Sequence, residues 1–152
     1  MSLHNRIETD LRDAMKRRDA PATSSLRMVV AALKNRAIAD GLGPQGRLDD
    51  AVVEAVIAGE AKKRREAAEA FAAAGRSDAA ASEQAEATLY GAYLPEPLTD
   101  DELDALIAEV VAAVGATEMK QMGAVMKEVL ARTGTRADGG RVTPRVKAIL
   151  GG

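Results

Sequence analysis

The sequence has no cysteine and no tryptophan, and it contains one histidine, His4, and three aromatic residues, Phe71, Tyr90 and Tyr93. Without cysteine there can be no disulfides, thiolate metal sites or thiol nucleophiles. We therefore expect no redox chemistry, no catalytic residue, no metal and no cofactor. Because aromatic residues favour strands and alanine favours helices, an aromatic content of 2% beside abundant alanine predicts an all-α fold.

Long apolar runs are also missing. The longest cover a handful of residues, whereas a membrane span needs roughly 20. Residues 1–12 carry charges where a secretion signal would have an apolar core. Since the lack of cysteine fits a reducing compartment, we expect a cytoplasmic protein that makes no membrane contact.

Apolar residues recur at intervals of three or four along the first two thirds of the chain, the spacing of amphipathic helices. The fourth of these helices is expected to start near Ser77 or Asp78 and to stop at Pro95, and Gly75 is expected to end the long third helix. The four apolar stripes run from Leu3 to Met15, from Leu26 to Ala37, from Leu48 to Phe71 and from Leu89 to Leu94.

Two prolines, Pro95 and Pro97, mark the best candidate boundary, because they hold the chain extended. The predicted division is an N-terminal bundle over residues 1–95, a linker over 96–98 and a C-terminal domain over 99–152. The expected architecture is a four-helix N-terminal bundle plus a small three-helix C-terminal domain.

Three helices are predicted after the linker. Thr99 and Glu102 have the spacing of a capping box, ahead of a stripe from Leu103 to Val114 that Gly115 closes. Thr117 is the expected cap of the next helix, whose stripe runs from Met119 to Leu130. The last helix is predicted to be short, over Pro144–Leu150, with Thr143 as its cap and proline at its first position.

Charge is distributed unevenly over this C-terminal part. Residues 98–118 carry six acids and no base, whereas seven basic residues and two acids follow Met119. Glycines between residues 134 and 141 would let backbone amides approach a phosphate, although Asp138 would suit capping better and the glycines could simply turn the chain. We expect the cations to converge on one exposed side. The candidate nucleic-acid-binding residues are Lys120, Lys127, Arg132, Arg136, Gly139, Gly140, Arg141, Arg145 and Lys147.

Other polar groups suggest ordinary surface roles. The run from Lys62 to Arg65 fans around its helix and is expected to pair with Glu66 and Glu69. A second basic set, Arg27, Lys34 and Arg36, is ambiguous. Glu83 and Glu86 lie one helical turn apart and are expected to be surface acids near Arg76 or a neighbouring helix. His4 is expected to be inert, near a mobile chain end.

The segment Met122-Gly123-Ala124-Val125-Met126-Lys127, followed by Arg136-Ala137-Asp138-Gly139, resembles the YqeY-like proteins of the GatB/YqeY family. Two departures from the family pattern are Ala79-Ala80, where a leucine is usual, and Pro97, where glutamine is more common. The resemblance spans the chain through Ala14-Met15-Lys16, Leu26-Arg27-Met28-Val29, Lys34-Asn35, Phe71, Gly75-Arg76 with Asp78, Glu83 with Glu86, and Tyr93-Leu94-Pro95.

Members of that family are similar to the C-terminal tail of the B subunit of the glutamine-dependent aminoacyl-tRNA amidotransferase, a helical arm that helps to hold tRNA. The resemblance therefore implies a non-catalytic protein that binds tRNA or other structured RNA. Since only three aromatic residues are present, recognition is expected to follow shape and charge.

Two alternatives remain open. The first is a protein-interaction module, in which the second and third helices dock an enzyme subunit or an aminoacyl-tRNA synthetase. The second is an accessory component of a carbon–nitrogen ligase that uses glutamine as amido donor.

Overall fold

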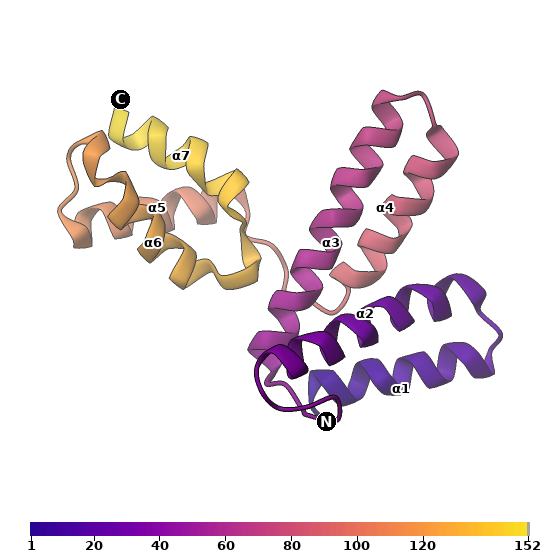
Figure 1. The fold of residues 1–152 in the computed structure, drawn as a ribbon. Helices are drawn as coiled ribbons and strands as arrows, with labels where there is room; N and C mark the ends of the chain where they lie inside the picture. The colour runs from indigo at the N-terminus through magenta and orange to yellow at the C-terminus, as the bar shows by residue number, and fades with distance from the viewer. Residues whose placement is uncertain (152) are drawn as a thin grey trace. The chain divides into compact units, whose positions relative to one another are not determined.

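The computed structural model describes residues 1–151. Over that range the chain forms seven α-helices, two short 3-10 helices and no strand (Figure 1). The all-α prediction is therefore confirmed. The chain divides into two compact units, Met1–Leu94 and Pro95–Gly152.

The N-terminal unit contains two helical hairpins. The first joins α1 to α2, and the second joins α3 to α4, as Figure 1 shows. Only the N-terminal part of α3 packs against the first hairpin, where Val53 and Ile57 enter a core shared with α1 and α2. The bounds are Leu3–Lys16 for α1, Ala20–Ala39 for α2, Asp50–Ala73 for α3 and Ser77–Gly91 for α4.

Tyr90 is the largest fully buried side chain of this unit. Its hydroxyl donates a hydrogen bond of 2.9 Å to the backbone carbonyl of Ser25 in α2, so the phenol is satisfied although no water reaches it. Burial raises the pKa of Tyr90 to about 12. Because Tyr90 stands near the end of α4, this contact ties the second hairpin to the first.

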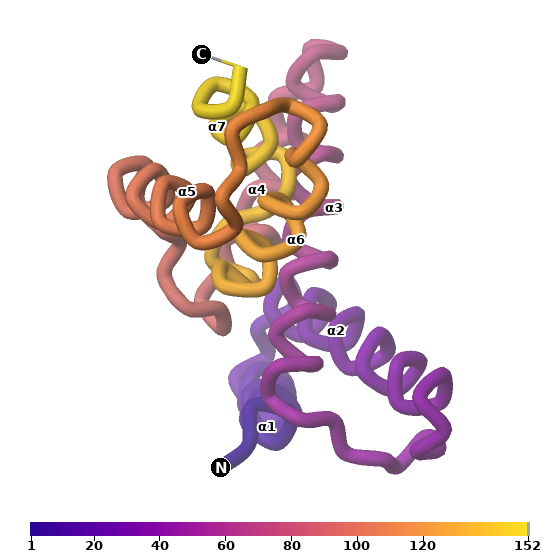
Figure 2. The backbone as a smooth tube through the Cα atoms, turned by 90° about the vertical axis from the view of Figure 1, so that its left-hand side faces the viewer, coloured from indigo at the N-terminus to yellow at the C-terminus, as the bar shows by residue number. Residues whose placement is uncertain are grey.

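The N-terminus and the loop between α2 and α3, residues 40–49, are fixed by hydrogen bonds and core contacts within this unit. Figure 2 shows the path of the loop. The amide of Leu3 donates to Asp50 Oδ1 at 2.9 Å. Leu48 enters the core, and its amide donates to Nδ1 of His4 at 3.2 Å. The loop therefore packs back onto α1 before α3 begins.

Three helices end in the same way. Gly41, Gly75 and Gly115 adopt positive φ angles of 78°, 75° and 73° directly after α2, α3 and α5, which glycine does without steric cost. The expected end of the third helix at Gly75 is thus confirmed. After α1 the same position is taken by Arg18, with φ 56°.

The C-terminal unit begins with the predicted capping box. The amide of Glu102 donates to Thr99 Oγ1, and the amide of Thr99 donates to Glu102 Oε1, both at 3.1 Å. Leu98 lies in the core of this unit. The elements are α5 over Asp100–Val114, a 3-10 turn over Met119–Gln121, α6 over Met122–Thr133, a second 3-10 turn over Gly134–Arg136, and α7 over Gly139–Gly151.

The predicted start of the last helix was wrong. Helix α7 begins at Gly139 rather than at Pro144, because the carboxylate of Asp138 accepts from the amide of Arg141 at 2.9 Å and caps the helix there. Pro144 therefore sits inside the helix, and Thr143 is not its cap. One proline removes one hydrogen bond, which the longer helix tolerates.

The expected cap of α6 was also wrong. Thr117 does not cap, since a 3-10 turn precedes α6 and the side chain of Gln121 accepts from the amides of Thr117 and Glu118 at 2.6 and 3.0 Å. Several residues placed on buried stripes are instead exposed: Met15, Val114, Met119 and Leu130.

Replacing Pro144 with alanine tests the longer helix. Because Pro144 lies in the helix interior, Pro144→Ala should restore a backbone hydrogen bond and stabilise the chain by about 1 kcal/mol or more in chemical denaturation. If the helix began at Pro144, the same change would remove a favourable first residue and leave stability equal or lower.

Candidate nucleic-acid interface

The two arginines at the start of α7 are held by acids of α5. Arg141 Nη2 lies 3.0 Å from Asp100 Oδ1. Arg145 contacts the other oxygen of Asp100 at 3.0 Å and Asp104 Oδ1 at 2.6 Å, and the hydrogen bond with Asp104 raises the pKa of Arg145. These cations are therefore engaged within the C-terminal unit.

Three further candidate cations also have partners. Arg132 pairs with Glu128 at 3.0 Å and Lys120 with Glu118 at 3.2 Å. Arg136 Nε donates to the carbonyl oxygen of Glu96 at 2.8 Å. Within residues 1–151, the two exposed candidates without an acidic oxygen within 4.0 Å are Lys127 and Lys147.

The glycine segment does not form an open loop. Gly139 and Gly140 lie in the first turn of α7, and the amide of Arg141 is taken by the carboxylate of Asp138. A negative charge thus stands where the phosphate cradle was considered, and the capping alternative is correct. The expectation that all cations face one open side is wrong for Arg141 and Arg145, whose acidic partners lie about forty residues away in sequence.

A group of cations lies on the first hairpin, around the point where α1 ends and α2 begins, and the sequence analysis named only Arg27 among them. The sequence carried a visible indication, the run Lys16-Arg17-Arg18 beside Pro21. We call this group the hairpin cluster, and it consists of Arg12, Lys16, Arg17, Arg18 and Arg27, all exposed. None of these five side chains has an acidic oxygen within 4.0 Å among residues 1–151.

A groove opens within the hairpin cluster. Two of its residues, Arg18 and Arg27, line it together with the hydroxyl residues Thr23 and Ser24. Apolar lining comes from Ala20 and from two methionines, Met15 and Met28, which remain 49% and 39% exposed.

Two residues of the basic run Lys62–Arg65 in α3 pair with acids within the second hairpin. Arg64 is largely buried and lies 3.5 Å from Glu83, 3.8 Å from Glu86 and 3.9 Å from Glu60, so the two acids of α4 pair with a neighbouring helix. Lys63 pairs with Glu60 at 3.3 Å. The predicted pairing with Glu66 and Glu69 is not found among the described residues, because Glu60 stands one turn earlier on the same face.

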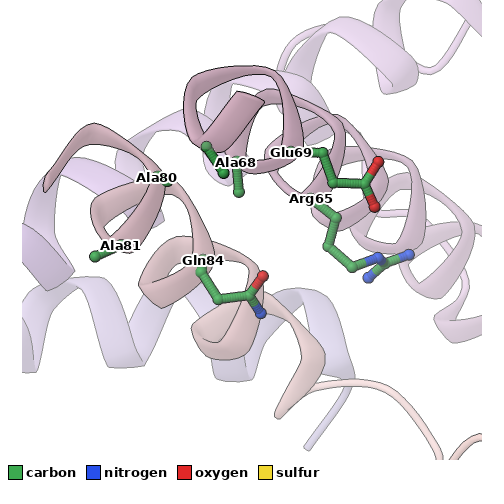
Figure 3. A pocket seen from close by; sticks show the side chains of 7 residues that line it. Arg65, Ala68, Glu69, Ala80, Ala81 and Gln84 are labelled. Carbon is green, nitrogen blue, oxygen red and sulfur yellow. The ribbon is translucent and has the colours of Figure 1, made fainter. Parts of the chain in front are cut away.

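Beyond Arg64, the second hairpin has a shallow hollow between α3 and α4, shown in Figure 3. Ala68, Ala80 and Ala81 leave the space between the helices unfilled, and Arg65 and Glu69 stand beside each other at its edge. An acid and a base side by side offer no single sign of charge to a ligand, so this hollow is a weaker anion site than the groove of the hairpin cluster.

His4 is not on a mobile end, contrary to expectation. It is 4% exposed, its Nδ1 accepts the amide of Leu48, and its Nε2 lies 3.7 Å from Glu8. Burial, and secondarily the charge of Arg47, lower the pKa of His4. The imidazole is a structural anchor for the loop before α3.

Among residues 1–151, no helix has the length and apolar character that crossing a membrane requires. Two helical units, each with its own hydrophobic core, define an all-α protein.

The chain belongs to the YqeY-like family: the family described as Yqey-like protein matches residues 4–150. No curated protein matches the chain.

The His4 anchor predicts a pH-dependent stability. A histidine whose pKa is lower in the folded state binds protons more readily when unfolded, so stability should be greatest above the unfolded pKa of 6.5 and fall as pH decreases below it. His4→Asn, which keeps an acceptor for Leu48, should flatten the dependence of unfolding free energy on pH between 5.5 and 8. This window lies above the range of Glu8, whose pKa is lowered chiefly by its hydrogen bond with Arg47. An unchanged slope would contradict the assignment.

Proposed function

We propose that this protein binds structured RNA, with tRNA as the candidate, through contacts with phosphate groups and without chemistry of its own. The observation that carries the proposal is the hairpin cluster, in which five exposed cations have no acidic partner within residues 1–151. The similarity of the family to the tRNA-holding tail of an amidotransferase subunit agrees with it.

Free cations favour phosphate binding for an energetic reason. An arginine or lysine that already pairs with a carboxylate must give up that partner before it can neutralise a phosphate. A side chain without an acidic partner has none to give up, and the release of counterions from the RNA favours its binding. In the C-terminal unit this argument favours Lys127 and Lys147 as phosphate contacts over Arg141 and Arg145, which have acidic partners.

The scarcity of aromatic side chains supports recognition of the backbone over stacking on bases. Tyr90 is fully buried and its hydroxyl is engaged with Ser25. Tyr93 is partly buried, its hydroxyl donates to Asp10 at 2.5 Å, and its ring is covered by the guanidinium of Arg6. Phe71 is covered by Arg76. No open aromatic platform of the kind used by single-strand binders is therefore offered by the described residues.

A protein partner is the second candidate, favoured by exposed apolar side chains on and after α2: Met28, Ile38 and Leu42 are 39%, 51% and 52% exposed. Affinity capture with and without nuclease separates the two. Partners that disappear after nuclease treatment support RNA, and partners that stay support a protein-interaction module.

The direct test is titration of labelled total tRNA at several salt concentrations. If about four phosphates are neutralised, log affinity should fall with log salt at a slope of roughly −3. The double variant Lys16→Gln, Arg17→Gln should bind about ten-fold more weakly and with a slope smaller by about one to two.

The matched control is Lys63→Gln, Arg132→Gln, which removes the same charge from two cations that have acids of their own. Its affinity should stay near that of the wild type. Equal losses in both double variants would show that only net charge matters, and absence of tRNA binding at low salt would end the proposal.

A further inference from the structure

Arg18 occupies a backbone position that normally belongs to glycine. It is the one residue other than glycine with positive φ within the described range. The amide of Arg18 donates to Met15 and that of Asp19 donates to Ala14, the same pattern of bonds that Gly41 and Gly75 complete after α2 and α3. A side chain with a Cβ is strained there, so the turn itself gives no reason for an arginine at this position.

The groove beside Arg18 combines three chemistries. Arg18 and Arg27 supply positive charge, Thr23 and Ser24 supply hydroxyls, and two half-exposed methionine side chains supply apolar surface. The nearest acid in the sequence, Asp19, is occupied as the cap of α2, where its carboxylate accepts from the amide of Ala22 at 3.2 Å. A ligand that uses all of this lining has an anionic group, polar hydroxyls and a flat apolar part.

We propose that this groove receives a single unstacked nucleotide of the bound RNA. The proposal rests on the RNA-binding function proposed above and specifies the part of the RNA that is read. The phosphate lies between Arg18 and Arg27, the ribose hydroxyls face Thr23 and Ser24, and the base covers the exposed methionine side chains.

A paired duplex does not fit this groove equally well. In an A-form helix the faces of the bases are stacked inside, and only phosphates, riboses and base edges reach the protein. A duplex would therefore neutralise the arginines and offer no base face to Met15 and Met28. Thioether side chains make favourable contacts with aromatic rings, and a loop nucleotide supplies such a ring. The protein should therefore prefer RNA with unpaired nucleotides.

The variant Arg18→Gly tests the role of the side chain apart from that of the turn, because it removes the guanidinium and keeps the backbone conformation. Because glycine adopts positive φ freely, this variant should melt about 4 °C higher than the wild type. It should nevertheless bind tRNA about ten-fold more weakly, since it loses a charge-assisted contact. A variant that is more stable and binds less cannot owe its loss to unfolding.

Two further variants complete the experiment, with total tRNA and a blunt-ended RNA duplex as probes at one salt concentration. Arg12→Gln, in the hairpin cluster but outside the groove, should lower affinity for both RNAs by about two- to three-fold. Met28→Ala should weaken binding of tRNA and leave binding of the duplex unchanged.

The outcomes distinguish the two proposals. If the wild type binds tRNA but Arg18→Gly behaves like Arg12→Gln, or if tRNA and duplex bind equally and Met28→Ala has no effect, the groove takes no nucleotide and RNA binding stands without it. If the wild type binds neither RNA at low salt, the RNA-binding function itself fails and the nucleotide site fails with it.

Discussion

The burial of Tyr90 is the contact on which the N-terminal unit depends. The core of this unit is otherwise made of aliphatic side chains, several of them alanines, with Ala14, Ala37 and Ala61 fully buried. Small side chains let helices approach closely but bury little surface each. The phenol of Tyr90 buries a large side chain in this core, and its hydrogen bond to Ser25 joins α4 of the second hairpin to α2 of the first.

In the C-terminal unit, charge pairing has the comparable role and also decides which surface is available to ligands. Asp100 and Asp104 lie in the first two turns of α5, near the end of the helix whose dipole favours negative charge. They pair with two arginines of α7. Exposed ion pairs contribute little to stability. Their main effect here is that Arg141 and Arg145 are engaged within the unit, while the cations of the hairpin cluster have no acidic partner among the described residues.

Much of the fold could be predicted from the sequence because it rests on local patterns. The stripe Leu26, Val29 and Leu33 is buried as expected, and the capping box at Thr99 forms. The start of the last helix was mispredicted because two local signals for a helix start lie close together. Pro144 suits the first position of a helix, but α7 begins earlier, directly after Asp138, which is its cap.

The candidate site was harder to predict, since it depends on contacts between residues far apart in sequence. Nothing near Arg141 indicates that Asp100 lies beside it, and nothing near His4 indicates that Leu48 closes over it. The run Lys16-Arg17-Arg18 was visible, but its freedom from acidic partners is a property of the folded unit.

Asp19 serves both helices of the first hairpin. Its amide closes the end of α1 by donating to Ala14, and its carboxylate opens α2 by accepting from Ala22. No spare residue therefore separates the two helices, and an insertion or deletion at this corner would disrupt one helix end or the other. The loop over residues 40–49, by contrast, has exposed positions around Pro44 and Gln45 where chain length can change at little cost. Variation in length among proteins of this architecture should accordingly collect after α2 and avoid the corner at Asp19.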